Sequence, residues 1–348
     1  MYSFEQLMTP IWNTDIIYEE SLTMVEYDGV AQAPLLFRPA EVLSVTSADK
    51  TAEYVQGEDW IIEDAVFRLT PQSRIFRFGE DEVLFDKEIK GKCFPTKDGR
   101  YSLFSEGHFF HDRQISITYK KAEGELKIRP AFCKNALPGS IGRLENGEPL
   151  KIVLFGDSIS AGANSSGLTL TTPFLPTWGN LLAENLRRAY GTGVGLINTA
   201  VGGKDSFWGI EQAKAAVGNY KPDLAIIAFG MNDRICGEEF AENIRKIREI
   251  VTEASPHTEF ILCATTLPNK ELRDFYKYQD AYAEALETLR EPGTVIADFG
   301  AMQKALLERK RFIDLTGNNV NHPNDFMIRC HAQFLSGMLI HGERGEKR

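Results

Sequence analysis

Residues 151–162 read Lys-Ile-Val-Leu-Phe-Gly-Asp-Ser-Ile-Ser-Ala-Gly, and this stretch decides the fold. The apolar run Ile152–Phe155 is typical of a strand that is covered on both faces of a sheet. Gly156 permits a tight turn after the strand, and Asp157 can cap that turn with its side chain. The stretch therefore predicts a strand that delivers the hydroxyl of Ser158 to a sharp turn. Taken alone, it is more readily explained as an ordinary strand-to-helix turn with a serine N-cap.

From this stretch to the C-terminus, apolar runs of strand length alternate with amphipathic stretches of helix length. The expected strands are Ile152–Phe155, Val194–Asn198, Leu224–Phe229, Phe260–Ala264 and Val295–Phe299. The expected helices are Trp178–Tyr190, Ile210–Val217, Glu238–Ala254, Asp274–Arg290 and Asn324–Ile340. This alternation predicts an α/β domain with a parallel sheet and right-handed crossovers.

The first 145 residues have a different sequence pattern, in which short apolar stretches typical of strands are broken by turn residues. The expected strands are Phe67–Leu69, Arg74–Phe78, Glu82–Phe85, Tyr101–Phe104, Gln114–Tyr119 and Glu125–Ile128, with a hairpin turn at Gly79–Asp81. Such a pattern is typical of a β-sandwich or jelly roll. The turn-rich stretch Ala136–Pro149 is expected to link the halves, which gives a β-domain over 1–145 and an α/β domain over 146–348.

Composition excludes several classes of protein. The chain has 348 residues and a net charge of −10, whereas nucleic-acid readers usually present a basic face, so no nucleic-acid partner is expected. No window approaches 18 uninterrupted apolar residues, so neither a transmembrane helix nor a membrane partner is expected. The sequence gives no indication of the oligomeric state.

The cysteines and the N-terminus indicate where the protein is expected to act. The five cysteines are scattered and form no Cys-x-x-Cys pair, which argues against a disulfide framework and fits a reducing compartment. Residues Met1–Asn13 lack the pattern of a signal peptide. We therefore expect a cytoplasmic protein, with the reservation that a leader can be missing from the sequence given.

Four polar signals follow the expected strands or precede the last helix. They are Ser158 in Gly-Asp-Ser, the glycine pair Gly202–Gly203, Asn232 in Gly-Met-Asn-Asp and His322 in His-Pro. Each alone has an ordinary structural explanation as a turn, a helix cap or a packed histidine. Ligands of parallel sheets bind outside the carboxyl ends of the strands, so the four together predict one site. In that site serine is a nucleophile, histidine is its general base, and glycine and asparagine donate hydrogen bonds to an oxyanion.

These motifs resemble those of the SGNH/GDSL hydrolases. The resemblance covers Lys151 to the C-terminus and implies a flavodoxin-like three-layer α/β/α domain with five parallel strands. It implies that Ser158 is the nucleophile, His322 the base, and Gly203 and Asn232 the oxyanion donors. In domain order the chain is similar to two-domain carbohydrate esterases in which a β-sandwich precedes the SGNH domain. That similarity implies a small acyl ester, preferably an O-acetyl group on a sugar, as substrate.

One residue departs from the family pattern. The family usually has Asp three residues before the catalytic histidine, where this chain has Asn319. A neutral amide cannot stabilise an imidazolium as a carboxylate does. Either a backbone carbonyl orients His322 in a Ser–His dyad, or another acid such as Asp314 or Asp325 replaces the missing one.

The substrate-binding residues are expected to be Asp157, Trp178 and Trp208. The two tryptophans flank the motif loops and could stack on a sugar, although packing between helices explains them equally well. We expect no organic cofactor, because no dinucleotide or phosphate-loop motif is present. We expect no metal either, because strand alternation would turn His108 and His111 to opposite faces.

Two alternative functions remain open at this point. A lipid or thioester acyl hydrolase could use the same site. A non-catalytic carbohydrate-binding protein with a relict site would explain the large β-domain and the missing acid at Asn319.

Overall fold

The α/β region forms the larger of two lobes in the computed structural model, which describes residues 2–342. Its five strands are β12 (Leu150–Gly156), β13 (Val194–Asn198), β14 (Leu224–Ala228), β15 (Glu259–Ala264) and β16 (Thr294–Asp298). They pair in parallel in the order β13-β12-β14-β15-β16, which is the flavodoxin order. The predicted three-layer α/β/α class with five parallel strands is therefore confirmed.

Helices cover both faces of this sheet because successive side chains of each strand point to opposite sides. On one face, Ile152 and Leu154 pack with α3 (Pro138–Glu145), α5 (Trp178–Tyr190), α9 (Phe299–Leu307) and α10 (Asp325–Leu339). On the other, Val153 and Phe155 pack with α6 (Ser206–Ala216), α7 (Gly237–Ala254) and α8 (Tyr282–Glu287). The single-turn helix α4 (Ser158–Ala161) follows β12 directly. Short 3-10 turns lie at Gly218–Tyr220, Gln279–Ala281 and Phe312–Asp314.

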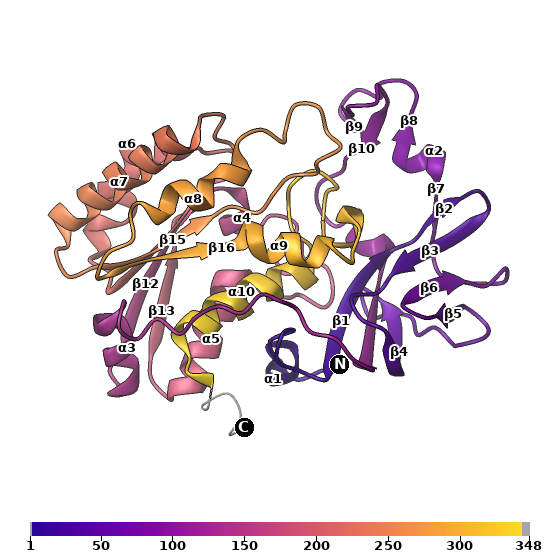
Figure 1. The fold of residues 1–348 in the computed structure, drawn as a ribbon, viewed down its shortest axis with the longest axis horizontal. Coiled ribbons are helices and arrows are strands. Elements are labelled where there is room, and N and C mark those ends of the chain that lie inside the picture. Colours follow the sequence, from indigo (N-terminus) through magenta and orange to yellow (C-terminus); the bar gives the residue numbers. More distant parts are fainter. Residues whose placement is uncertain (1, 343–348) are drawn as a thin grey trace.

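A β-rich region precedes the α/β region, as predicted, and forms the lobe on the right of Figure 1. One antiparallel sheet has the order β1-β11-β4, with β1 (Ile16–Thr23), β11 (Gln114–Lys121) and β4 (Pro39–Ser47). A second sheet has the order β5-β6-β3-β2-β7, with β5 (Trp60–Glu63), β6 (Val66–Leu69), β3 (Val30–Pro34), β2 (Val25–Tyr27) and β7 (Phe78–Gly79). A small third sheet joins β8 (Leu84–Phe85), β10 (Tyr101–Leu103) and β9 (Cys93–Pro95).

Several predicted elements of this half were wrong. The expected hairpin at Gly79–Asp81 does not form, because Glu80–Val83 fold into the short helix α2 and β7 pairs in parallel with β2. Glu125–Ile128 is not a strand. The expected linker Ala136–Pro149 contains α3, whose Ile141 and Leu144 are buried. The N-terminus carries a further short helix, α1 (Phe4–Leu7), and His111–Arg113 form a 3-10 turn.

In the second half, the expected helix Asp274–Arg290 was too long and α9 was missed. Residues before the 3-10 turn at Gln279 are held by the β-rich region instead: Arg273 N donates to Pro95 O at 2.9 Å, and the ring of Phe275 packs on Phe94. These tertiary contacts override the helical pattern. The last strand ends at Asp298 rather than Phe299, because the Asp298 side chain accepts from Ala301 N at 2.8 Å and starts α9.

The two halves share one hydrophobic core. Ile17 and Leu22 of β1 belong to the same buried cluster as Phe326 and Leu335 of α10. The boundary between residues 145 and 146 stays a prediction, since this cluster runs across it. Within residues 2–342, no helix is long and apolar enough to cross a membrane.

Candidate active site

Ser158 lies where the sheet order reverses, at the carboxyl end of β12, and it is the first residue of α4. Gly156 is required there, because a Cβ at this position would lie 2.2 Å from the Ala228 carbonyl oxygen of β14. Asp157 caps the helix, since its Oδ1 accepts from Ile159 N at 3.0 Å. The strand, the glycine and the cap together present the serine on the sharp turn that the sequence predicted.

The imidazole of His322 meets this serine. Nε2 of His322 lies 2.9 Å from Oγ of Ser158, although 164 positions separate the two residues in the chain. The His322 side chain is 11% exposed, so the imidazole is largely enclosed by protein. The main chain of His322 is also fixed: its carbonyl accepts from Thr316 Oγ1 and from Gly317 N, each at 2.9 Å.

Asn164 binds the other side of the imidazole. Its Oδ1 lies 2.7 Å from His322 Nδ1, while its Nδ2 donates to the carbonyls of Gly107 at 2.7 Å and Gly317 at 3.2 Å. Two carbonyl acceptors fix which end of the amide carries the nitrogen, so the end that faces the ring is an oxygen. His322 must then carry its proton on Nδ1, which leaves the lone pair of Nε2 directed at Ser158.

Glu106, which belongs to the β-rich region, also faces Nδ1. Its Oε2 lies 3.3 Å from Nδ1 of His322, and its Oε1 accepts from Asn318 Nδ2 at 3.2 Å. Burial raises the pKa of the Glu106 carboxyl, but hydrogen bonds and charge from His322 and the amide of Asn318 lower it by more. The net pKa is below the usual range of a glutamate, so this group is a carboxylate at neutral pH.

Neither Asn319, at the position of the missing acid, nor the two acids named as its replacements orients His322. Asn319 turns toward the β-rich region, where its Nδ2 donates to Ser102 Oγ at 3.0 Å and to Leu103 O at 3.1 Å. Asp314 pairs with Arg311, and Asp325 Oδ1 accepts from Ser166 N at 2.9 Å. The acceptor closest to Nδ1 is a side-chain amide, not the backbone carbonyl of a simple dyad. The two named acids, Asp314 and Asp325, were therefore wrong, whereas the broader alternative that another acid replaces the missing one is consistent with Glu106.

Asn164 and Glu106 escaped the sequence analysis for a physical reason. They lie 158 and 216 positions from His322, and no spacing connects them to it. The only signal was indirect: a missing acid at position 319 implies that another group faces the ring.

Gly203 and Asn232 occupy loops at the same sheet edge. Gly203 has a left-handed backbone with φ 73°, in the turn before α6. Asn232 follows β14, and its Nδ2 donates to Lys204 O at 2.9 Å, which uses one of its two hydrogens. Asp233 beside it accepts from Ser206 N at 3.0 Å, so the loop after β14 is fastened to the start of α6. Their roles as oxyanion donors stay predictions.

Two residues expected to bind substrate are instead buried. Asp157 is 1% exposed, and its burial raises its pKa to about 7. Trp178 is 0% exposed; its Nε1 donates to Ile159 O at 3.0 Å, and its ring packs on Phe299. Neither side chain can contact a substrate, because each is enclosed by protein.

Trp208 is partly buried on α6. Its ring packs on Phe155 at 5.5 Å between centroids, and Lys204 Nζ lies 5.5 Å from its centroid. It serves as a packing aromatic, and its contact with a substrate stays a prediction.

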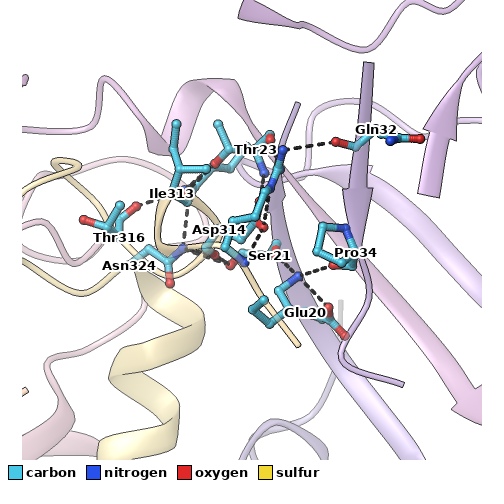
Figure 2. A network of polar contacts seen from close by, with 12 residues as sticks. Glu20, Ser21, Thr23, Gln32, Pro34, Ile313, Asp314, Thr316 and Asn324 are labelled. Carbon is cyan, nitrogen blue, oxygen red and sulfur yellow. Dashed lines mark hydrogen bonds and ion pairs between the residues drawn. The ribbon is translucent and has the colours of Figure 1, made fainter. Parts of the chain in front are cut away.

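The segment that carries His322 is fastened to β1 by a network of polar contacts (Figure 2). Asp314 Oδ1 accepts from Thr23 N at 2.9 Å, and Ser21 Oγ donates to the Asp314 carbonyl. Asn324 Nδ2 donates to that same carbonyl at 2.9 Å and to Ser21 Oγ at 2.9 Å. Asn324 also caps α10, since its Oδ1 accepts from Met327 N. The position of His322 thus depends on the β-rich region as well as on the sheet.

The reason given for excluding a metal at His108 and His111 was wrong, although the two rings do lie apart. The segment is a turn followed by a 3-10 helix rather than a strand. His108 pairs with Asp112 at the surface, whereas His111 is buried with Nε2 2.7 Å from Thr172 O. Within residues 2–342, no group of three or more His, Cys, Asp or Glu side chains is placed to hold a metal ion.

Comparisons with known proteins give the family. The structure of a two-domain esterase (CEX) active on acetylated mannans matches with a TM-score of 0.50 and 21% identity, over 63% of this chain and 55% of that one. A mutant of Axe2, an acetyl-xylooligosaccharide esterase from Geobacillus, matches with a TM-score of 0.46 and 19% identity, over 55% and 94%. The chain thus spans about half the length of the first structure, and the likeness shows the fold alone. Curated proteins gave no match. The family model of the GDSL-like lipases/acylhydrolases matches residues 154–327, half of the chain, and the protein belongs to this family.

Proposed function

We propose that the protein is a serine esterase that removes small acyl groups, preferably O-acetyl groups from a carbohydrate. The observation that carries the proposal is the 2.9 Å contact between Ser158 Oγ and His322 Nε2. Because Asn164 accepts from Nδ1, the free lone pair of Nε2 faces the hydroxyl and can take its proton. This is the geometry that general-base activation of a serine needs.

In the first half-reaction, Oγ of Ser158 attacks the ester carbonyl carbon as His322 takes the hydroxyl proton. Negative charge grows on the carbonyl oxygen. The backbone N–H groups of Ser158 and Gly203 and the second amide hydrogen of Asn232 are the proposed donors to it. Each such donor contributes roughly 3 kcal/mol to the transition state. The C–O bond of the leaving alcohol then breaks, and the alcohol departs with the proton held by His322.

In the second half-reaction, water replaces the alcohol. His322 takes a proton from the water as its oxygen attacks the acyl carbon. The bond to Ser158 Oγ breaks, and the serine recovers its proton from the imidazolium. The products are a carboxylic acid and the original enzyme.

Similarity to a solved structure supports the choice of substrate class. The name of the solved two-domain structure states activity on acetylated mannans, and that protein shares this fold at 21% identity. A β-rich region beside the site would give a polysaccharide an extended surface to lie on. A sugar O-acetyl ester is therefore the proposed substrate of this chain.

A chain-length series tests the proposal. We expect hydrolysis of p-nitrophenyl acetate, with kcat/KM falling from acetyl to octanoyl esters, and release of acetate from acetylated manno- or xylo-oligosaccharides. Ser158→Ala should abolish both activities while its far-ultraviolet circular dichroism is unchanged. Activity that rises with chain length would favour a lipid acyl hydrolase. Sugar binding without any hydrolysis would favour the relict site.

A further inference from the structure

The carboxylate beside His322 comes from the other half of the molecule. Glu106 follows β10 of the small third sheet, whereas His322 precedes α10 at the edge of the parallel sheet. We propose that Glu106 is the acid that stabilises the protonated form of His322, and that Asn319, at the family's usual acid position, fastens the strand that presents Glu106. The inference rests on the proposed esterase function, which supplies the proton that His322 must hold.

The first argument is the division of contacts around Nδ1. Asn164 lies closer, at 2.7 Å, and fixes the tautomer, but an amide carries no charge to offset an imidazolium. Glu106 lies at 3.3 Å and carries that charge. One aspartate usually performs both tasks in such a site. Here a neutral residue orients the ring and a separate carboxylate stabilises its protonated form.

The second argument is that the chain around Glu106 is fixed on both sides by residues of the active-site loops. Before it, Leu103 O accepts from Asn319 Nδ2 at 3.1 Å. After it, Gly107 O accepts from Asn164 Nδ2 at 2.7 Å. Between them, Oε1 of Glu106 itself accepts from Asn318 Nδ2 at 3.2 Å. An incidental surface glutamate would not be fixed at three points by the segments that hold the catalytic pair.

The third argument concerns Asn318, which connects the acid to the histidine loop. Its Oδ1 accepts from the backbone N–H groups of Val320, Asn321 and His322 at 3.0, 3.0 and 3.1 Å. Its Nδ2 donates to Glu106. Movement of Glu106 would therefore disturb the main chain that carries His322.

The exposure of the Glu106 side chain determines how strongly its charge acts on His322. The Glu106 side chain is 50% exposed, so water and salt screen its charge in part. Among the described residues, Glu106 from the β-rich region and Asp157 from the start of α4 are acids on whose pKa the charge of His322 acts. We therefore expect a graded loss when Glu106 is removed rather than abolition.

The test is the pH dependence of kcat/KM for p-nitrophenyl acetate in the full-length protein at low ionic strength. Glu106→Gln should lower the plateau roughly tenfold. It should also move the acidic limb to lower pH, because the imidazolium loses its counter-charge and releases its proton more readily. Glu106→Asp should leave the limb near its wild-type position. Glu88→Gln removes an exposed carboxylate from the same region and should change neither quantity.

A second readout does not depend on turnover. The ring of His322 can be titrated by NMR, with its signals assigned through His322→Gln. Its titration midpoint should move to lower pH in Glu106→Gln and not in Glu88→Gln. An unchanged midpoint, or a lower plateau with an unmoved acidic limb, would overturn the role of Glu106. Absence of esterase activity in the wild-type protein would overturn the proposed function. The titration midpoint of His322 would still decide whether Glu106 and His322 are coupled electrostatically.

Discussion

At the scale of single residues, Asn164 determines which nitrogen of His322 carries the proton. Asn164 adopts a left-handed backbone with φ 62°, a conformation that asparagine tolerates better than most residues. That conformation directs its amide toward three groups at once, two carbonyls and the imidazole. The ring orientation therefore depends on one side chain that has no charge.

Asn164→Gly tests this role without straining the backbone, because glycine accepts positive φ. The variant removes the acceptor of Nδ1, so the ring can rotate or change tautomer. We expect kcat for p-nitrophenyl acetate to fall about 100-fold, within the range that a general base contributes, while KM changes little. Steady-state kinetics measure both values. Wild-type kcat in this variant would show that the amide does not orient the ring.

Asp157, buried beside Ser158, makes stability depend on pH. Burial raises its pKa to about 7 in the folded protein, against about 3.9 in an unfolded chain. A raised folded pKa means that the contribution of Asp157 to stability is largest below pH ~4 and is lost as the pH rises toward ~7, because folding then buries a charge. Asp157→Asn should therefore increase the free energy of unfolding at pH 8 relative to wild type, and have little effect at pH 4.

Urea denaturation at the two pH values measures this difference. Asp205→Asn is the matched control, since Asp205 caps α6 in the same way but is only half-buried. An Asp157→Asn effect that is equal at pH 4 and pH 8 would contradict the account.

The sequence predicted some residues of the site better than others. The place of Ser158 at the sheet edge was predictable, because it directly follows an apolar strand. Its pairing with His322, which follows no strand of this sheet, was expected from the four motifs together and from the family resemblance. Glu106 was not, because it reaches the site from an irregular loop after β10, whose position depends on contacts between the two halves. Trp178 was misjudged, because proximity in sequence to a motif loop does not reveal which way a side chain points.

At the scale of elements, continuous apolar runs located the strands of the parallel sheet to within about two residues, since burial on both faces leaves a strong signal. The β-rich region was harder. Glu80–Val83 became a helix where a hairpin was expected, because the capping of Gly79 N by Glu82 at 2.7 Å is a local contact that strand alternation does not reveal. The predicted type of element, helix or strand, was wrong where tertiary contacts or helix caps outweighed the sequence pattern.

Asn319 links the loop that carries His322 to strand β10, and the substitution Asn319→Asp tests this role. The substitution restores the residue that the family usually has. We nevertheless expect lower activity and a loss of stability of about 1–3 kcal/mol. The new carboxylate cannot donate to the Leu103 carbonyl and would repel it, which frees the strand β10 that presents Glu106. Thermal unfolding and kcat/KM measure the two effects. Higher activity in this variant would contradict the assignment of Asn319 as an anchor.

At the scale of the whole molecule, a buried ion pair connects the two halves. Lys310 Nζ lies 2.6 Å from Glu20 Oε1, and both side chains are fully buried. The amine also donates to the carbonyls of Ser21 and Pro34, and Tyr119 donates to the other oxygen of Glu20. Lys310 lies between α9 and the Asp314 network of Figure 2, so this pair ties the segment that leads to His322 to β1.

Lys310→Met should destabilise the protein by about 3–5 kcal/mol, because Glu20 would be left as an uncompensated buried charge. The control is Lys304→Met, which removes a surface pair with Asp280 and should cost less than about 1 kcal/mol. Denaturant titration of both variants measures the difference. Equal free energies of unfolding for Lys310→Met and Lys304→Met would show that the buried pair does not hold the halves together.

The central claim is that Ser158 is a nucleophile activated by His322, and covalent labelling tests it most directly. The folded protein should react with a serine-directed fluorophosphonate, and peptide mapping should place the adduct on Ser158. Labelling should be lost in Ser158→Ala and strongly slowed in His322→Gln. Folded wild-type protein that takes up no label, or label that persists in Ser158→Ala, would contradict the account.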